Sequence, residues 1–146
     1  MSEKAIPVAL RRLVITRARH CCEYCRTQSH YSADPLTIDH IIPLRVGGPA
    51  VADNLALCCH GCNQHKAGRI SVRDAVTDSL GSLCNPRMQS WEEHFTWNQD
   101  FTRMLGMTPA GHATIAALQL NRSGLVNLRR VLYMVGEHPP KPQNAS

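Results

Sequence analysis

Two five-residue segments of the chain share one cysteine pattern. CCEYC spans residues 21–25 and CCHGC spans residues 58–62. Within each segment, two cysteines separated by two residues can direct both sulfur atoms at one ion through a tight turn. Four thiolates in a tetrahedron are typical of structural zinc. The spacing therefore predicts a zinc site formed by Cys22, Cys25, Cys59 and Cys62.

The remaining cysteines and a redox function are the alternatives to this assignment. Two redox-active dithiols are disfavoured, because the pattern is duplicated and no thioredoxin-like βαβ pattern accompanies it. Cys21 and Cys58 could replace Cys22 and Cys59 as ligands, at a spacing one residue longer. We expect Cys21 and Cys58 to be small buried apolar side chains instead, and Cys84 to lie in the core.

The composition is that of a small globular protein, and the charge bears on the kind of partner. The 146 residues include 16 Lys and Arg against 11 Asp and Glu, a net charge of +5, and 43% are hydrophobic. The basic balance mildly favours a polyanion as the partner. The N-terminal MSEKAIPVALRR has no apolar run of the kind found in secretory signals, and no run could cross a membrane. We therefore expect a cytoplasmic protein with reduced thiols.

The patterning predicts the elements that must hold the cysteines. A helix is expected from Pro7 to about residue 20, short strands over 36–42 and 55–58, and a brief helix over 62–68 closed by a glycine. Further helices are expected over 109–120 and from residue 123. The expected parts of the chain are an N-terminal amphipathic helix (1–20), a metal-binding core (21–70), a mainly helical C-terminal extension (71–137) and a disordered tail (138–146).

Several polar residues accompany the cysteine pairs. Asp39-His40 and Asn54 lie between the pairs, and Asn63 directly follows the last cysteine. The stretch CEYC…TIDHIIPLRVGGPAVADNLALCCHGCNQHKAGR, at about residues 20–70, resembles HNH endonucleases of the zinc-bracketed type. The downstream segments NPRMQSWEEHFTW and GMTPAGHATIAALQLN resemble the long form of small bacterial HNH proteins. The resemblance implies an α+β fold, with a ββα-metal (His-Me finger) core stapled by the four-cysteine zinc site and flanked by α-helices.

The resemblance also implies phosphodiester hydrolysis with one divalent ion. His40 is then the general base, because the pKa of a histidine lies near working pH. Asp39 and Asn63 supply oxygen ligands to catalytic Mg²⁺ or Mn²⁺, and Asn54 fixes the loop that orients His40. In the members that give the family its name, histidine stands at the position of Asn63. The amide found here favours an oxygen-preferring ion such as Mg²⁺.

Several basic residues are candidates for contacts with nucleic-acid phosphates, the alternative being ordinary solvated side chains. They are Lys66, Arg69, Arg45, Arg11 and Arg12.

Three functions from different classes follow from these features. The first is a metal-dependent endonuclease that cuts DNA, with double-stranded DNA as the expected partner. The second is a catalytically inert zinc-ribbon module that binds nucleic acid, for which the cysteine pairs and the positive charge suffice. The third is a toxin-like component that an inhibitory or targeting protein partner controls.

Overall fold

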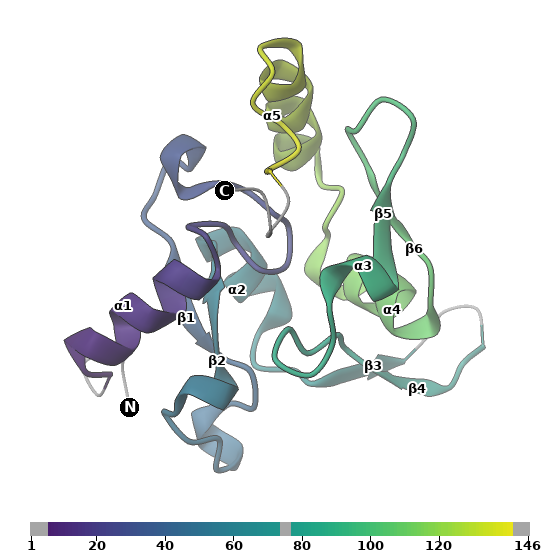
Figure 1. The fold of residues 1–146 in the computed structure, drawn as a ribbon. Coiled ribbons are helices and arrows are strands. Elements are labelled where there is room, and N and C mark those ends of the chain that lie inside the picture. The colour runs from purple at the N-terminus through teal and green to yellow at the C-terminus, as the bar shows by residue number, and fades with distance from the viewer. Residues whose placement is uncertain (1–5, 74–76, 142–146) are drawn as a thin grey trace.

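The computed structural model describes residues 6–73 and 77–141 (Figure 1). The first five residues of the expected N-terminal part, and residues 142–146 of the expected disordered tail, lie outside these described residues. The described residues form three separate two-stranded antiparallel sheets together with helices, an α+β arrangement as expected. Three short 3-10 turns connect them, at Ser29–Tyr31, Leu44–Val46 and Ala52–Asn54.

The central unit is a hairpin followed by a short helix. Strand β1 (Thr37–His40) pairs with β2 (Leu55–Cys58), so that His40 lies opposite Leu55. The second strand has the predicted bounds. The first ends two residues early, because the side chain of Asn54 takes over the hydrogen bonds of the Ile42 backbone. Helix α2 (His60–Lys66) follows directly, and this ββα order is the one that the resemblance implies.

The ends of α2 are set by local chemistry. The helix begins two residues before the predicted start, since Cys59 is its N-cap and accepts a hydrogen bond from the Cys62 backbone through Sγ. It ends where Ala67 and Gly68 both adopt positive φ, as a helix closed by glycine does. These caps fix the positions of Cys59 and Cys62 relative to the hairpin.

Helix α1 (Val8–Arg17) packs against the hairpin. Pro7 is its N-cap and not the first-turn residue that the sequence predicted, so the helix begins one residue later. Val14 forms a small core with Ile38, Leu55 and Leu57 of the two strands. The helix is shorter than expected, because residues 19 and 20 adopt positive φ and lead the chain into the first cysteine turn.

The C-terminal extension contains more strand than expected. Two hairpins precede its long helices: β3 (Ser71–Arg73) with β4 (Leu80–Ser82), and β5 (Phe95–Trp97) with β6 (Met104–Gly106). Its helices are α3 (Trp91–His94), α4 (Pro109–Leu118) and α5 (Ser123–Met134). The sequence patterns did not predict these strands, because they have only three residues each and carry no clear alternation. Helices still make up most of the regular structure of the described extension.

One core joins the zinc-type cysteines to the C-terminal extension. Helix α4 packs against α2, β4 and β6, and Figure 1 shows the extension beside the central hairpin. The cysteines share a buried cluster with Leu118, Leu120 and Leu125. The expected tail begins too early, because His138 is buried and its ring bonds to the Phe101 carbonyl. Within residues 6–73 and 77–141, the helices are too short or too polar to span a membrane.

Candidate metal centre and active site

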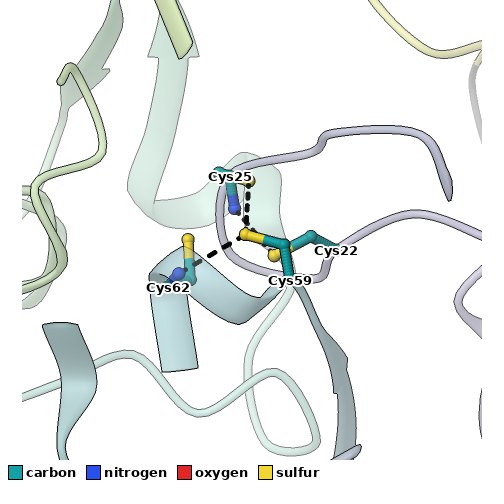
Figure 2. Close-up of side chains that lie close together, drawn as sticks. All are labelled: Cys22, Cys25, Cys59 and Cys62. Atoms are coloured by element: carbon teal, nitrogen blue, oxygen red, sulfur yellow. Dashed lines mark hydrogen bonds between the residues drawn. The ribbon is translucent and has the colours of Figure 1, made fainter. Parts of the chain in front are cut away.

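Four cysteine side chains converge between the first cysteine turn and the start of α2 (Figure 2). They are Cys22, Cys25, Cys59 and Cys62, all buried, and their sulfur atoms lie within 4.8 Å of one another. In each pair, the sulfur of the first cysteine accepts a hydrogen bond from the backbone N–H of the second, at 3.5 Å in one turn and 3.4 Å in the other. The duplicated sequence pattern therefore becomes two turns of the same local geometry.

The cluster has the dimensions of a four-thiolate zinc site. The sulfurs of Cys25 and Cys59 are 3.7 Å apart. A tetrahedron with zinc–sulfur bonds of about 2.3 Å has edges of about 3.8 Å. Hydrogen bonds from neighbouring thiols hold the pKa of the Cys59 thiol far below its usual value, the largest effect coming from Cys22. The pKa values of Cys22, Cys25 and Cys62 are raised instead, chiefly by burial and by hydrogen bonds within the cluster, so without a metal the four sulfurs favour one thiolate shared among three thiols.

The other cysteines lie where expected. Cys21 and Cys58 are buried, and their thiols donate hydrogen bonds to backbone carbonyls of Arg19 and Cys59. Cys84 is in the core. None of these three belongs to the metal-type cluster found among the described residues.

A second cluster surrounds Asp39 on the face of β1 that meets α2. The Asp39 carboxylate accepts a hydrogen bond of 2.9 Å from the Tyr24 hydroxyl. The Lys66 ammonium lies 3.2 Å from Asp39 Oδ2 and donates to the Ile41 carbonyl at 3.1 Å. Burial raises the pKa of the Asp39 carboxyl, and the ammonium and hydroxyl act in the opposite direction. The carboxylate is thus held beside a cation.

This cluster corrects the expectation for Lys66. Its side chain is only 2% exposed, and that of Asp39 is 6% exposed. A lysine in this position is the counter-ion of a buried carboxylate, since burying either charge alone would cost several kcal/mol. The ammonium cannot reach a phosphate on the surface without leaving Asp39 unpaired.

His40 follows Asp39 on the strand and therefore points to the opposite face. Its Nε2 atom is buried and makes no hydrogen bond within the described part of the chain. His94 Nε2 is likewise buried without a partner, so this feature does not by itself mark a reaction site. At His40 it leaves a ring nitrogen open to another molecule beside the Asp39 cluster.

Asn54 fastens the loop that follows His40. Its Oδ1 accepts from the Ile42 N–H at 2.9 Å, and its Nδ2 donates to the carbonyls of Ile42 at 3.0 Å and Pro49 at 2.9 Å. Gly48 allows this close packing, because a Cβ there would lie 1.6 Å from the Ile42 carbonyl oxygen. The loop is therefore held at both ends by one buried amide.

The remaining predicted residues lie on the surrounding surface. Asn63 is half-buried on α2. Arg45 and Arg69 are exposed, but both donate to backbone carbonyls, Arg45 to Gly68 and Arg69 to Lys66 among others. Arg12 is exposed and Arg11 is half-buried on α1. Arg69 lines the same pocket as Lys66, whereas Arg11 and Arg12 lie on α1.

Sequence patterns missed three contributors to these sites. Tyr24 bonds to Asp39, and Arg122 and Arg129 reach the cysteine turns from the C-terminal extension. Arg122 donates to the sulfurs of Cys59 and Cys62, and Arg129 donates to the Cys25 carbonyl. Contacts that span 60 residues or more leave no local spacing signal. Tyr24 lies between Cys22 and Cys25, and nothing in that pattern indicates its partner Asp39.

Comparison with known protein families agrees with this geometry. The model of the HNH endonuclease family matches residues 22–69, and the match ends before the C-terminal extension. No curated protein and no solved structure matches the chain. The matched segment runs from the first cysteine ligand to the end of α2, and it includes both clusters. Residues 22–69 are therefore similar to the HNH endonuclease family, and this segment contains the cysteine cluster suited to zinc.

Proposed function

We propose that the protein hydrolyses phosphodiester bonds in DNA, with His40 as the general base. The observation that carries the proposal is the buried, unpartnered Nε2 of His40 at the end of β1, among the residues described. That nitrogen can accept a proton from an attacking water once a substrate phosphate covers the site. Histidine suits this role because its neutral form is available near pH 7.

A divalent ion, Mg²⁺ or Mn²⁺, is the proposed cofactor, and Asp39 and Asn63 would hold it. Their carboxylate and amide oxygens are ligands that such ions prefer. When bound, the ion neutralises charge on the scissile phosphate and on the leaving oxygen. The Asp39 carboxylate already attracts a cation, since the Lys66 ammonium lies 3.2 Å from it. An incoming ion must compete with that ammonium, so we expect weak metal binding in the absence of substrate.

Asn54 acts in this proposal through His40. The three hydrogen bonds of its side chain hold the loop that begins directly after His40. Holding the loop restricts the direction of the imidazole, and such outer contacts often decide how well a reacting group is oriented. Asn54 is thus a positioning residue.

A catalytically inert zinc-ribbon module that binds nucleic acid is the second candidate. The contact between Lys66 and Asp39 favours it, because the ammonium lies close to both carboxylate oxygens and already neutralises the charge that would attract a metal. In this alternative the salt bridge is permanent, and the positive charge of the chain alone supports binding.

Incubation with supercoiled plasmid separates the two candidates. We expect no cleavage after dialysis against a chelator that spares the zinc cluster, and nicking or linearisation when Mg²⁺ or Mn²⁺ is restored. Added Zn²⁺ alone is the control, since the amide and carboxylate favour the harder ions. Binding of the plasmid without cleavage under every metal condition would establish the inert module instead.

Binding to DNA should weaken steeply with salt. Exposed arginines would contact phosphates and release counterions, so the logarithm of affinity falls linearly with the logarithm of salt concentration. We expect Arg12→Ala and Arg45→Ala each to reduce the slope by about one, with little dependence on sequence. Arg103→Ala, an exposed arginine in the loop between β5 and β6, is the matched control. A loss of affinity with an unchanged slope would remove Arg12 and Arg45 from the interface.

A further inference from the structure

Arg122 places a guanidinium group directly on the cysteine cluster. Its Nη2 donates to the sulfur of Cys59 at 3.6 Å and to that of Cys62 at 3.7 Å, and its Nη1 also reaches Cys62 at 3.7 Å. The same Nη1 donates to the carbonyls of Leu118 and Gln119, each at 3.1 Å, at the end of α4. These hydrogen bonds of the guanidinium thus all go to sulfur atoms or carbonyl oxygens.

The charge of a four-thiolate zinc centre explains why a cation is needed there. Four thiolates around Zn²⁺ carry a net charge of about −2. The four cysteines lie in a buried cluster with apolar side chains such as Leu118 and Leu120. Burying a charge without a partner is costly, and hydrogen bonds to a charged group are stronger than those between neutral groups. A guanidinium on two of the sulfurs spreads and partly neutralises this charge.

Gly61 leaves the space that Arg122 occupies. A Cβ at residue 61 would lie 2.5 Å from Arg122 Nη2 and 3.1 Å from its Cζ. Glycine inside a helix is unfavourable relative to alanine, so its presence in α2 has a local cost. Clearance for the guanidinium accounts for that cost.

A second arginine also connects the C-terminal extension to the cysteine turns. Arg129 is buried on α5, and its Nη2 donates to the carbonyls of Cys25 at 3.3 Å and Leu120 at 2.8 Å. Its guanidinium also lies over the Trp97 ring, 5.0 Å from the centroid. Two cations from the C-terminal extension therefore approach the cluster, one on each cysteine pair.

We propose that Arg122 is a positioning residue of the zinc centre, and that its hydrogen bonds to Cys59 and Cys62 hold the metal in place. The C-terminal extension, which lies outside the family match, then completes the zinc site of the domain. The inference concerns zinc and goes beyond the proposed cleavage of DNA. A protein that binds zinc but does not cut DNA leaves it intact.

The test measures zinc affinity in the full chain by competition with a chromophoric chelator. We expect Arg122→Met to weaken zinc binding by about 10–100-fold, the usual effect of removing a partner of a metal ligand. Arg122→Lys should restore part of the loss, because it keeps a charge but cannot donate to two sulfurs in a fixed fork. Arg130→Met is the matched control, since Arg130 lies exposed on α5, the helix that follows Arg122, and donates a hydrogen bond to Asn127.

The absorption spectrum of the cobalt-substituted protein is a second measurement, and a change in the stability of the fold alone would not shift it. Hydrogen bonds lower the energy of thiolate electrons, so their removal should shift the sulfur-to-Co²⁺ charge-transfer band to longer wavelength. Gly61→Ala should produce the same shift and the same loss of zinc affinity by displacing the guanidinium. Alanine is a better helix former than glycine. If Gly61→Ala acted only through the stability of α2, it would therefore strengthen zinc binding and not weaken it.

Three outcomes would overturn the inference. One is a parent protein that folds without zinc. Another is an Arg122→Met protein with zinc affinity within twofold of the parent. The third concerns the case in which Arg122→Met does not fold. The inference is then wrong if Arg122→Lys and Gly61→Ala both have the zinc affinity and the cobalt spectrum of the parent protein.

Discussion

Replacing His40 with alanine should reduce plasmid cleavage by about 10²–10⁴-fold, the range that a positioned general base contributes. The substitution removes the base but leaves Asp39 and Asn63 unchanged, so binding of Mn²⁺ and of DNA should persist. The measurement is the rate of nicking under single-turnover conditions, together with DNA affinity and zinc content. His65→Ala is the control, because His65 is an exposed histidine on α2.

Two companion variants separate the roles around His40. Asp39→Asn should lower activity through the ion, and excess Mn²⁺ should restore part of the rate. Asn54→Ala should give a loss that added metal does not recover, because it frees the loop after His40. Asn54→Ala also leaves buried backbone groups unsatisfied, at about 1–3 kcal/mol each, so its folded fraction must be measured alongside. If His40→Ala cuts plasmid at the parent rate, the proposed nuclease mechanism is wrong.

The variant Lys66→Met distinguishes the two candidate functions at the same site. A nuclease whose metal competes with the ammonium should bind Mn²⁺ more tightly after this change. In an inert module with a permanent salt bridge, the same change should lower the free energy of unfolding, because Asp39 would be left as an unpaired buried charge. Added Mn²⁺ should not restore that stability.

The local parts of this molecule could be predicted from the sequence. The strand Leu55–Cys58, the start of α4 at Pro109 and the start of α1 one residue after Pro7 follow from residue types within a few positions of each other. The same holds for the cysteine cluster, since each turn is local and the hairpin of β1 and β2 connects the two turns. The metal centre was therefore the most predictable feature.

Long-range polar contacts could not be predicted. Lysine is rarely buried, so exposure was the natural expectation for Lys66. Its burial depends on Asp39, 27 residues away, and nothing near Lys66 in the chain reports that partner. The contacts of Arg122 with the cysteines span 60 residues or more. The short strands of the C-terminal extension were missed because three residues are too few to show alternation.

The zinc cluster supports the largest predicted effect on folding. We expect the purified protein to contain about one zinc per chain, and Cys25→Ser or Cys62→Ser to abolish the folded state. Structural zinc contributes about 10–16 kcal/mol of apparent binding free energy in small zinc modules. That is as large as the whole free energy of unfolding of many domains, which lies at about 5–15 kcal/mol. The measurements are metal analysis and thermal unfolding with and without a strong chelator.

Cys21→Ser is the matched control for this prediction. Cys21 neighbours a predicted ligand and is buried, but its sulfur donates to the Arg19 carbonyl and lies outside the cluster. A serine hydroxyl can make the same hydrogen bond, so this variant should keep one zinc and unfold near the parent temperature. Loss of zinc in Cys21→Ser with retention in Cys22→Ser would move the ligand to Cys21. Because the hairpin that carries Asp39 and His40 connects the two cysteine turns, chelation should also abolish cleavage, and restored Mg²⁺ alone should not recover it.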